Sequence, residues 1–237
     1  MAHTVMEHVR DVLVMLAQVL YYWLVAIVRA ILPASIQGKD ISGETVLITG
    51  AETASICKGY GVSVDTYTIN LCDREAIYKL ADKTVKAFLP DMMTRNHGHI
   101  VNIASSAGLI GVTGLADYCA SKFAAVGFDE SLRFELMAQG KTGINTTVVC
   151  PFFINTGMFE GAKTRFPFLL PILEPAYVAD KIVEAVLCNQ TLLALPRILY
   201  VFFAIKGFIP STSGYLLSKY LGAHNLMDEF KGRQKAE

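Results

Sequence analysis

The sequence predicts an α/β fold built on a mainly parallel sheet, preceded by a helix long enough to enter a membrane. Short β-branched runs alternate with longer stretches whose apolar residues recur at helical spacing, which is typical of parallel strands joined by crossover helices. Hydrophobic residues make up 53% of the 237 residues, and charged residues 18%. Such a chain is long enough and apolar enough to bury a core, which excludes an intrinsically disordered protein.

The elements follow one another in a regular order. Pro90 should kink or stop the first helix of the domain, because proline lacks the backbone N–H, whereas Pro175 suits the first position of the third. The strand candidates are residues 45–49, 62–69, 100–104, 144–150 and 191–195. The helix candidates are residues 74–93, 118–137 and 175–187, and the inward face of the second is predicted to carry Ala124, Ala125, Phe128, Leu132 and Leu136.

The N-terminal part of the chain is unusually apolar. Residues 12–32 contain no polar or charged side chain except Gln18 and Arg29 and, as a helix, would be about 31 Å long, close to the thickness of a bilayer core. A retained membrane anchor is the favoured interpretation, with a buried core helix and a cleaved signal peptide as alternatives. Because Arg29 and Lys39 lie at the far end, the positive-inside rule places the rest of the chain in the cytosol.

A second apolar stretch covers residues 192–209. Its longest uninterrupted run, residues 198–205, is too short to span a bilayer. A strand and a loop in the core fit this stretch, and so does a patch lying on the membrane surface. The sequence therefore predicts three parts: an anchor at residues 1–40, the α/β domain at residues 41–190, and a last strand with an apolar, membrane-associated C-terminal region at residues 191–237.

Charge, cysteine and histidine content argue against several kinds of site. Lys and Arg together number 21 and so do Asp and Glu, so no basic surplus exists to bind nucleic acid. The five cysteines are scattered without a Cys-x-x-Cys pair, which predicts neither a zinc site nor a disulfide framework. His97 and His99 lack a third ligand nearby and are expected to be solvated in a turn, so no metal site is predicted.

Tyr118 and Lys122 are the residues that point to a chemical activity. They lie four residues apart, on one face of a helix. A nearby ammonium lowers the pKa of a phenol, which makes the phenol usable as a general acid or base near neutral pH. Tyr215 and Lys219 have the same spacing, but only the Tyr118 pair follows a strand, the hydroxyl residue Ser105 and a glycine-rich loop.

These segments resemble a known family. The run His99-Ile-Val-Asn-Ile-Ala-Ser-Ser-Ala-Gly108, followed by Tyr118-Cys-Ala-Ser-Lys122, is similar to the classical short-chain dehydrogenase/reductase family. Residues 115–125, 150–160 and 169–175 resemble its membrane-bound branch, which contains the epidermal retinol dehydrogenases and the lipid-droplet hydroxysteroid dehydrogenases. The resemblance runs almost without gaps from about residue 84 to the end. It implies a Rossmann-like, doubly wound parallel sheet.

The resemblance also implies catalytic roles for three residues. Tyr118 would exchange a proton with the alcohol or carbonyl oxygen of the substrate. Lys122 would lower the pKa of Tyr118 and bind the ribose next to the nicotinamide. Ser105 would hydrogen-bond the substrate oxygen. The implied reaction is hydride transfer between a nicotinamide cofactor and a lipophilic alcohol or carbonyl, such as a retinol or a steroid.

For the cofactor, NAD or NADP, the resemblance implies further contacts. Ile154 and Thr156 match positions that contact the nicotinamide amide, and Gly50 matches the first glycine of the phosphate-binding turn. The family opens with Thr-Gly-x-x-x-Gly-x-Gly, whose glycines let the pyrophosphate approach the backbone. Here the later glycine positions hold Ala54 and Ile56.

The first half of the domain is also short. The family passes from its first to its fifth strand through four crossovers and three strands, which need roughly 55 residues or more. Residues 50–98 offer 49. We therefore predict two internal deletions, near residues 51/52 and 83/84, that leave a shortened sheet still able to close through right-handed crossovers.

Two hypotheses about activity follow. The first is an active, membrane-anchored oxidoreductase, whose anchor suits a substrate dissolved in lipid. The second is a relic or splice form that keeps the catalytic helix, cannot hold the cofactor, and acts by binding, as a homodimer or with intact relatives through the helix of Tyr118. In both, the resemblance implies the endoplasmic reticulum membrane or lipid droplets, with the domain facing the cytosol.

Overall fold

The computed structural model describes residues 2–32, 37–39, 46–49, 88–156, 161 and 163–223. The chain divides into two compact units, Met1–Asp40 and Ile41–Glu237. Three features expected from the sequence fall outside the described residues: the strand at residues 62–69, most of the helix at residues 74–93, and the cofactor candidate Gly50.

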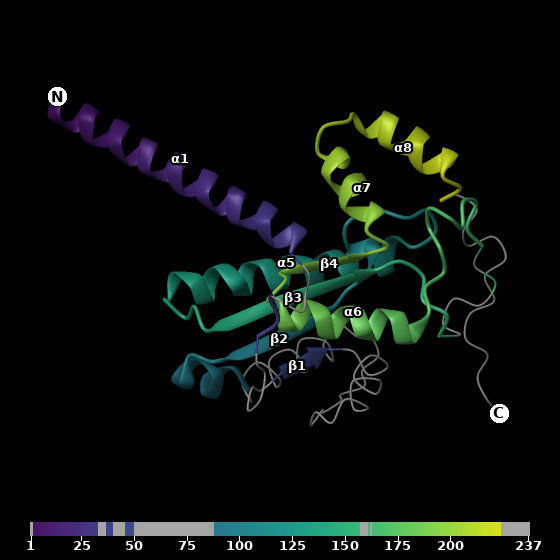
Figure 1. Cartoon of the computed structure of the whole chain (residues 1–237). Helices are drawn as coiled ribbons and strands as arrows, with labels where there is room; N and C mark the ends of the chain where they lie inside the picture. Colours follow the sequence, from purple (N-terminus) through teal and green to yellow (C-terminus); the bar gives the residue numbers. More distant parts are fainter. Residues whose placement is uncertain are drawn as a thin grey trace. The chain divides into compact units, whose positions relative to one another are not determined.

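The first unit contains one long helix, α1 (Ala2–Ile31), drawn in purple in Figure 1. Its stretch Val9–Val28 is long and apolar enough to cross a membrane. α1 is therefore a candidate membrane anchor.

Within the described residues, the second unit is built on a four-stranded sheet. All three strand pairings in it are parallel, which confirms the α/β fold with a parallel sheet. The spatial order follows the order along the chain (Figure 1): β1 (Val46–Thr49), β2 (Gly98–Ile103), β3 (Ile144–Pro151) and β4 (Leu192–Leu195).

The pairing of β1 shows how the shortened sheet closes. Val46 lies opposite His99 and Thr49 opposite Asn102, so β1 pairs directly with β2. In a doubly wound sheet the first strand neighbours the fourth, and the fourth neighbours the fifth. β2 is the strand that the family resemblance matches to the fifth. β1 therefore lies beside the strand that would be two places away from it in the full fold, as expected for a shortened sheet.

Helices cover both faces of the sheet. Side chains alternate between the two faces along each strand. Val101, Val149 and Leu193 pack with residues of α6, whereas Val148 and Cys150 belong to the cluster that α5 and α7 cover. The helical elements of this unit with defined bounds are η2 (Ser106–Gly108), α5 (Ala116–Ala138), α6 (Pro175–Leu187), α7 (Ile198–Lys206) and α8 (Ser211–Tyr220).

The inward face of α5 differs from the predicted one. Leu132 and Leu136 are buried as expected, but Ala124 and Phe128 are exposed. The buried row instead includes Asp129, next to Phe128. The helix is rotated by about one position because the Asp129 carboxylate has hydrogen-bond partners on the sheet, which its apolar neighbour could not use.

Two further expectations need correction. Residues 88–95 are helical, so Pro90 does not stop the helix there. In the apolar stretch 192–209, β4 forms as predicted, but the expected loop is helix α7. The apolar run of α7 suits a helix because one side of it packs on the sheet through Leu199.

Candidate active site

Ser105 lies at the carboxyl end of β2, where the chain leaves the sheet. Its backbone is extended, and its Oγ accepts a hydrogen bond from the N–H of Ala107 at 3.2 Å, which caps the η2 turn. Its hydroxyl points toward the carbonyl oxygen of Pro151, at the end of β3, 3.5 Å away. Ligands of open parallel sheets bind at this edge of the sheet.

Tyr118 reaches the same place from the first turn of α5. Its phenol is hydrogen-bonded to the side chain of Ser105. Burial raises the pKa of Tyr118, and the hydrogen bond from Ser105 offsets part of that rise. The sequence predicted the opposite direction, through the charge of Lys122. Loss of water around the phenolate is the larger effect in this structure.

Lys122 follows one helical turn later. Its Nζ donates a hydrogen bond to the carbonyl oxygen of Ile103 at 3.4 Å and lies 5.6 Å from the centre of the Tyr118 ring. Burial lowers the pKa of Lys122.

Near Lys122, burial raises the pKa of the Cys150 thiol to about 12, so this thiol stays neutral beside the ammonium. The structure thus brings Ser105, Tyr118 and Lys122 together.

The loop after Ser105 is pressed against α5 at a glycine. A Cβ on Gly108 would lie 2.6 Å from the carbonyl oxygen of Lys122, closer than the Cβ atoms of real side chains approach a neighbouring atom. Glycine therefore lets the η2 turn touch α5, which fixes Ser105 relative to Tyr118.

We expect Gly108→Ala to destabilise the domain by about 1–3 kcal/mol, since the backbone must move to admit the methyl group. A thermal melt of the full-length protein measures this change. Gly111→Ala is the matched control, because a Cβ there meets nothing within 4 Å and the residue lies in the same loop. Equal melting temperatures for the two variants would contradict the close packing.

The proposed nicotinamide contacts lie in the segment after β3. Ile154 forms a parallel bridge with Leu173, and the N–H of Asn155 donates to the carbonyl oxygen of Leu173 at 2.9 Å. Thr156 follows, with its N–H bonded to the carbonyl oxygen of Ile154 at 2.8 Å. The pairing with Leu173 holds Ile154 in place beyond the end of β3, and the chain turns at Thr156.

The donor set of the site fits the nicotinamide–ribose half of a dinucleotide. An ammonium carries three N–H donors, and the bond from Lys122 to Ile103 uses one of them, so others can point at two ribose hydroxyls. The phenol of Tyr118 and the hydroxyl of Ser105 sit beside it. The phosphate-binding turn, with Gly50, lies outside the described residues.

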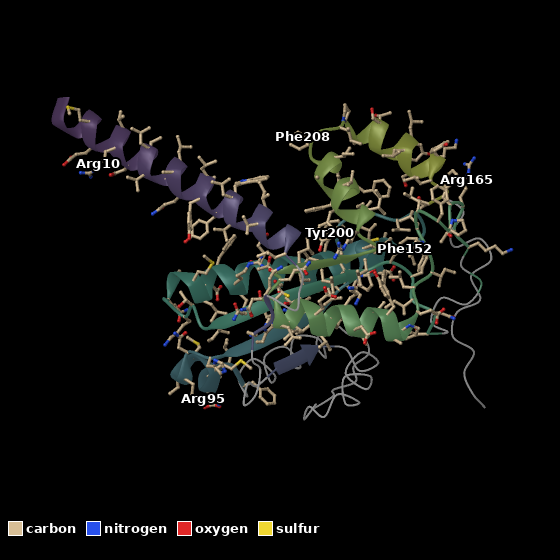
Figure 2. The ribbon with its side chains drawn as sticks, viewed as in Figure 1. Arg10, Arg95, Phe152, Arg165, Tyr200 and Phe208 are labelled. Carbon is tan, nitrogen blue, oxygen red and sulfur yellow. The ribbon has the colours of Figure 1, made fainter. Side chains whose placement is uncertain are left out.

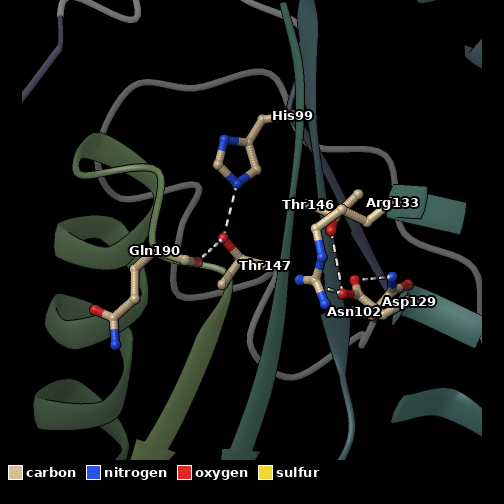
Figure 3. Close-up of polar contacts among 7 residues, drawn as sticks. All are labelled: His99, Asn102, Asp129, Arg133, Thr146, Thr147 and Gln190. Atoms are coloured by element: carbon tan, nitrogen blue, oxygen red, sulfur yellow. Dashed lines mark hydrogen bonds and ion pairs between the residues drawn. The ribbon is translucent and has the colours of Figure 1, made fainter. Parts of the chain in front are cut away.

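A buried polar network, which the sequence analysis did not single out, ties α5 to the sheet (Figure 3). The side-chain amide of Asn102, in β2, donates to the carboxylate of Asp129 at 2.8 Å, and the hydroxyl of Thr146, in β3, donates at 3.1 Å. Arg133 lies 3.4 Å from the same carboxylate. Asp129 is eleven residues after Tyr118, which is three helical turns along the same face of α5. This spacing is the sequence signal that could have indicated that Asp129 faces the sheet.

His99 also differs from expectation. It lies in β2 and is completely buried, whereas His97 is exposed as predicted. The hydroxyl of Thr147 donates to the carbonyl oxygen of Gln190 at 2.7 Å, so Thr147 accepts the hydrogen bond from Nε2 of His99 at 2.8 Å. This chain of hydrogen bonds, also visible in Figure 3, satisfies the buried ring and makes His99 part of the sheet's core.

Comparison with known proteins agrees with this geometry. The profile of the short chain dehydrogenase family matches residues 82–165. Human epidermal retinol dehydrogenase 2 is 37% identical to the chain over 301 residues, which cover 95% of this chain and 97% of that protein. The chain belongs to the short-chain dehydrogenase family.

Other members of the family add detail. Retinol dehydrogenase 10-B of Xenopus laevis is 46% identical over 155 residues, which are 64% of this chain and 45% of that protein. A crystal structure of a short-chain dehydrogenase from Streptomyces avermitilis superposes with a TM-score of 0.51 at 18% identity, covering 76% of this chain and 97% of that one. The second comparison shows the shared fold.

The lengths of the alignments agree with the predicted deletions. The 301 positions aligned with the human dehydrogenase take up 95% of this chain, which is roughly 225 residues. About 75 positions of that relative therefore have no counterpart here. The shorter alignment with the Xenopus laevis protein shows almost no such excess, since 64% of the chain is roughly 152 residues against 155 positions.

Proposed function

We propose that this short-chain dehydrogenase transfers hydride between NAD or NADP and a retinol-like alcohol or aldehyde dissolved in a membrane. The observation that carries the proposal is the hydrogen-bonded pair of Ser105 and Tyr118, with Lys122 on the same helix face, at the carboxyl edge of the sheet. The pair combines an acid or base with a hydroxyl that can hold the substrate oxygen.

Each residue of the site has a distinct part in the proposed reaction. The cofactor, when bound, supplies or accepts the hydride. Ser105 hydrogen-bonds the substrate oxygen, and Tyr118 gives that oxygen a proton during carbonyl reduction or removes one during alcohol oxidation. Lys122 binds the ribose hydroxyls. Because burial raises the pKa of Tyr118, the phenol is protonated at neutral pH, which is the form that carbonyl reduction requires.

Two observations support a retinol-like substrate and a membrane location. Relatives at 37% and 46% identity carry the name retinol dehydrogenase, and α1 is apolar enough to hold the domain at the bilayer in which such a substrate dissolves. The proposed membrane is that of the endoplasmic reticulum or of lipid droplets, with the domain on the cytosolic side, because Arg29 and Lys39 follow the apolar stretch.

A pairing through α5 is the proposed oligomeric contact, either between two copies of this chain or with an intact relative. This helix exposes large apolar side chains that a partner helix would cover, namely Phe123, Phe128, Phe134 and Met137. Co-purification of two differently tagged copies from detergent tests it. Replacing Phe134 with glutamate should separate them, and copies that never co-purify would count against the pairing.

The experiment that decides the function starts from the full-length protein in nanodiscs. We expect saturating NADH or NADPH to raise its melting temperature, because a ligand that binds the folded state alone stabilises it. Retinaldehyde added with the stabilising cofactor should then be reduced to retinol, measured by chromatography. Tyr177→Phe is the control variant for substitutions in the site, because Tyr177 lies exposed on α6. It should keep both the melting-temperature shift and the turnover.

The same experiment separates the two hypotheses about activity. A cooperative melt that neither cofactor shifts would contradict the proposal and favour a folded relic that acts by binding. A cofactor-induced rise in melting temperature without turnover of retinaldehyde would still support a cofactor-dependent dehydrogenase. It would contradict the proposal of a retinol-like substrate. Screening of steroid alcohols would then follow.

A further inference from the structure

The hairpin of α7 and α8, residues 198–220, presents an apolar surface that the described chain does not cover. Leu199 packs against the sheet, but the other side of α7 is exposed, and α8 buries none of its residues. Phe208, which is 90% exposed, lies where the two helices meet (Figure 2). The other large apolar side chains exposed on the hairpin include Val201, Phe203, Tyr215, Leu216 and Tyr220.

The C-terminal end of α8 is tied to the described chain through Arg165. The guanidinium of Arg165 donates to the carbonyl oxygen of Tyr220 at 3.0 Å and lies 5.3 Å from the centre of its ring. A helix of ten residues is marginal in water by itself, and helices in proteins gain most of their stability by burying an apolar face. Burial of the exposed apolar side of α8 against a partner would therefore stabilise the helix.

The charges around the hairpin indicate that this partner is a bilayer surface. Between Glu184 and Asp228 the chain has no acidic residue, whereas Arg197, Lys206 and Lys219 are basic. Aromatic and basic side chains around an apolar face are the combination that settles at the boundary of lipid headgroups and acyl chains, where anionic lipids attract it.

The candidate anchor brings this surface close to a bilayer. Residues 33–45, thirteen in number, connect the end of the anchor segment to β1. Fully extended, they reach at most about 50 Å, so the second unit stays near any membrane that α1 spans. A tethered surface has a high effective concentration, and a contact that is weak by itself is then sufficient.

We propose that the α7–α8 hairpin docks into the bilayer that α1 spans, with Phe208 at the boundary of headgroups and acyl chains. The docked hairpin adjoins the loop that follows Ser105. Nζ of Lys206, at the end of α7, donates to the carbonyl oxygen of Leu109 at 2.8 Å and lies 4.8 Å from the ring centre of Phe123, the neighbour of Lys122. A substrate dissolved in lipid would enter beside it; this step, like the spanning of the bilayer by α1, rests on the proposed function.

The test measures the depth of single tryptophans in the full-length chain. Trp23, the one native tryptophan, is changed to phenylalanine, and Phe208→Trp is added. The protein is reconstituted in vesicles of phosphatidylcholine and phosphatidylserine whose acyl chains carry bromine, which quenches tryptophan on contact. We expect fluorescence of the Phe208→Trp variant to fall about twofold or more, since interfacial helices bury their apolar face about 5–10 Å deep.

The matched control is Tyr177→Trp in the same background. Tyr177 is an exposed aromatic residue on α6, which covers the opposite face of the sheet from α7, so its fluorescence should not change. Adding Leu216→Glu to the Phe208→Trp variant should abolish quenching without lowering the melting temperature, because Leu216 is exposed.

Two results would overturn the proposal. Equal fluorescence of the Phe208→Trp variant in brominated and unbrominated vesicles would mean that the hairpin does not touch lipid. A blue shift that appears without quenching and grows with protein concentration would show instead that a second copy of the chain covers the hairpin. Neither readout depends on catalytic activity, so failure of the docking and failure of the proposed reaction are distinguishable.

Discussion

Tyr118→Phe is expected to lower kcat for retinaldehyde reduction by about 10²–10⁴-fold, the usual contribution of a general acid. The variant removes the phenolic hydroxyl that is hydrogen-bonded to Ser105 and leaves the ring in place. The melting temperature and its shift with cofactor should change little. Steady-state kinetics in nanodiscs measure the effect, with Tyr177→Phe as the control.

The pH dependence of alcohol oxidation and of carbonyl reduction offers a second check on the role of Tyr118. Its raised pKa means that the phenolate forms only at high pH. Alcohol oxidation needs the phenolate, so its rate should rise with pH toward that pKa, whereas carbonyl reduction needs the phenol and should fall only above it. A Tyr118→Phe variant that retained both pH profiles would show that another group moves the proton.

Asp129→Ala is expected to cost the domain about 2–4 kcal/mol, because it leaves the buried amide of Asn102 and the buried hydroxyl of Thr146 without their acceptor. A domain of this size loses roughly 5–10 °C of melting temperature for such a change. Glu135→Ala, at an exposed position of the same helix, is the control and should fall within about 0.5 kcal/mol of the native protein.

Asp129 also predicts how stability changes with pH. Burial raises its pKa above the ordinary value of 3.8, although its hydrogen bonds oppose the rise. The folded protein then binds this proton more tightly than the unfolded chain does, so this group's contribution to stability is greatest below pH 3.8 and is lost as the pH rises through the raised pKa. Asp129→Asn should remove that part of the pH dependence. An unchanged pH profile in that variant would mean that other groups cause it.

Much of the second half could be predicted because its signals are local. β3, β4, α5 and α6 begin and end within about two residues of the expected positions, since apolar periodicity and Pro175 mark them directly. The grouping of Ser105, Tyr118 and Lys122 followed from the order of strand, loop and helix. These features depend on neighbouring residues in the sequence.

The features that were missed depend on partners distant in the sequence. Asp129 is buried because Asn102 and Thr146 meet it across the sheet, and hydropathy alone assigned the inward position to Phe128 instead. The direction of the pKa shift at Tyr118 was wrong for the same reason: spacing along a helix reveals the nearby ammonium of Lys122 but not the loss of water around the phenol.

The direct pairing of β1 with β2 has a consequence for how such a chain tolerates loss of material. Parallel strands present evenly spaced donors and acceptors with one polarity, so any two of them can form a ladder. An interior strand with its helix can thus be excised and the edges rejoined without a register conflict. The groups around Tyr118 stand on β2, β3 and α5, so a change in chain length between β1 and β2 leaves the strands and the helix that hold them in place.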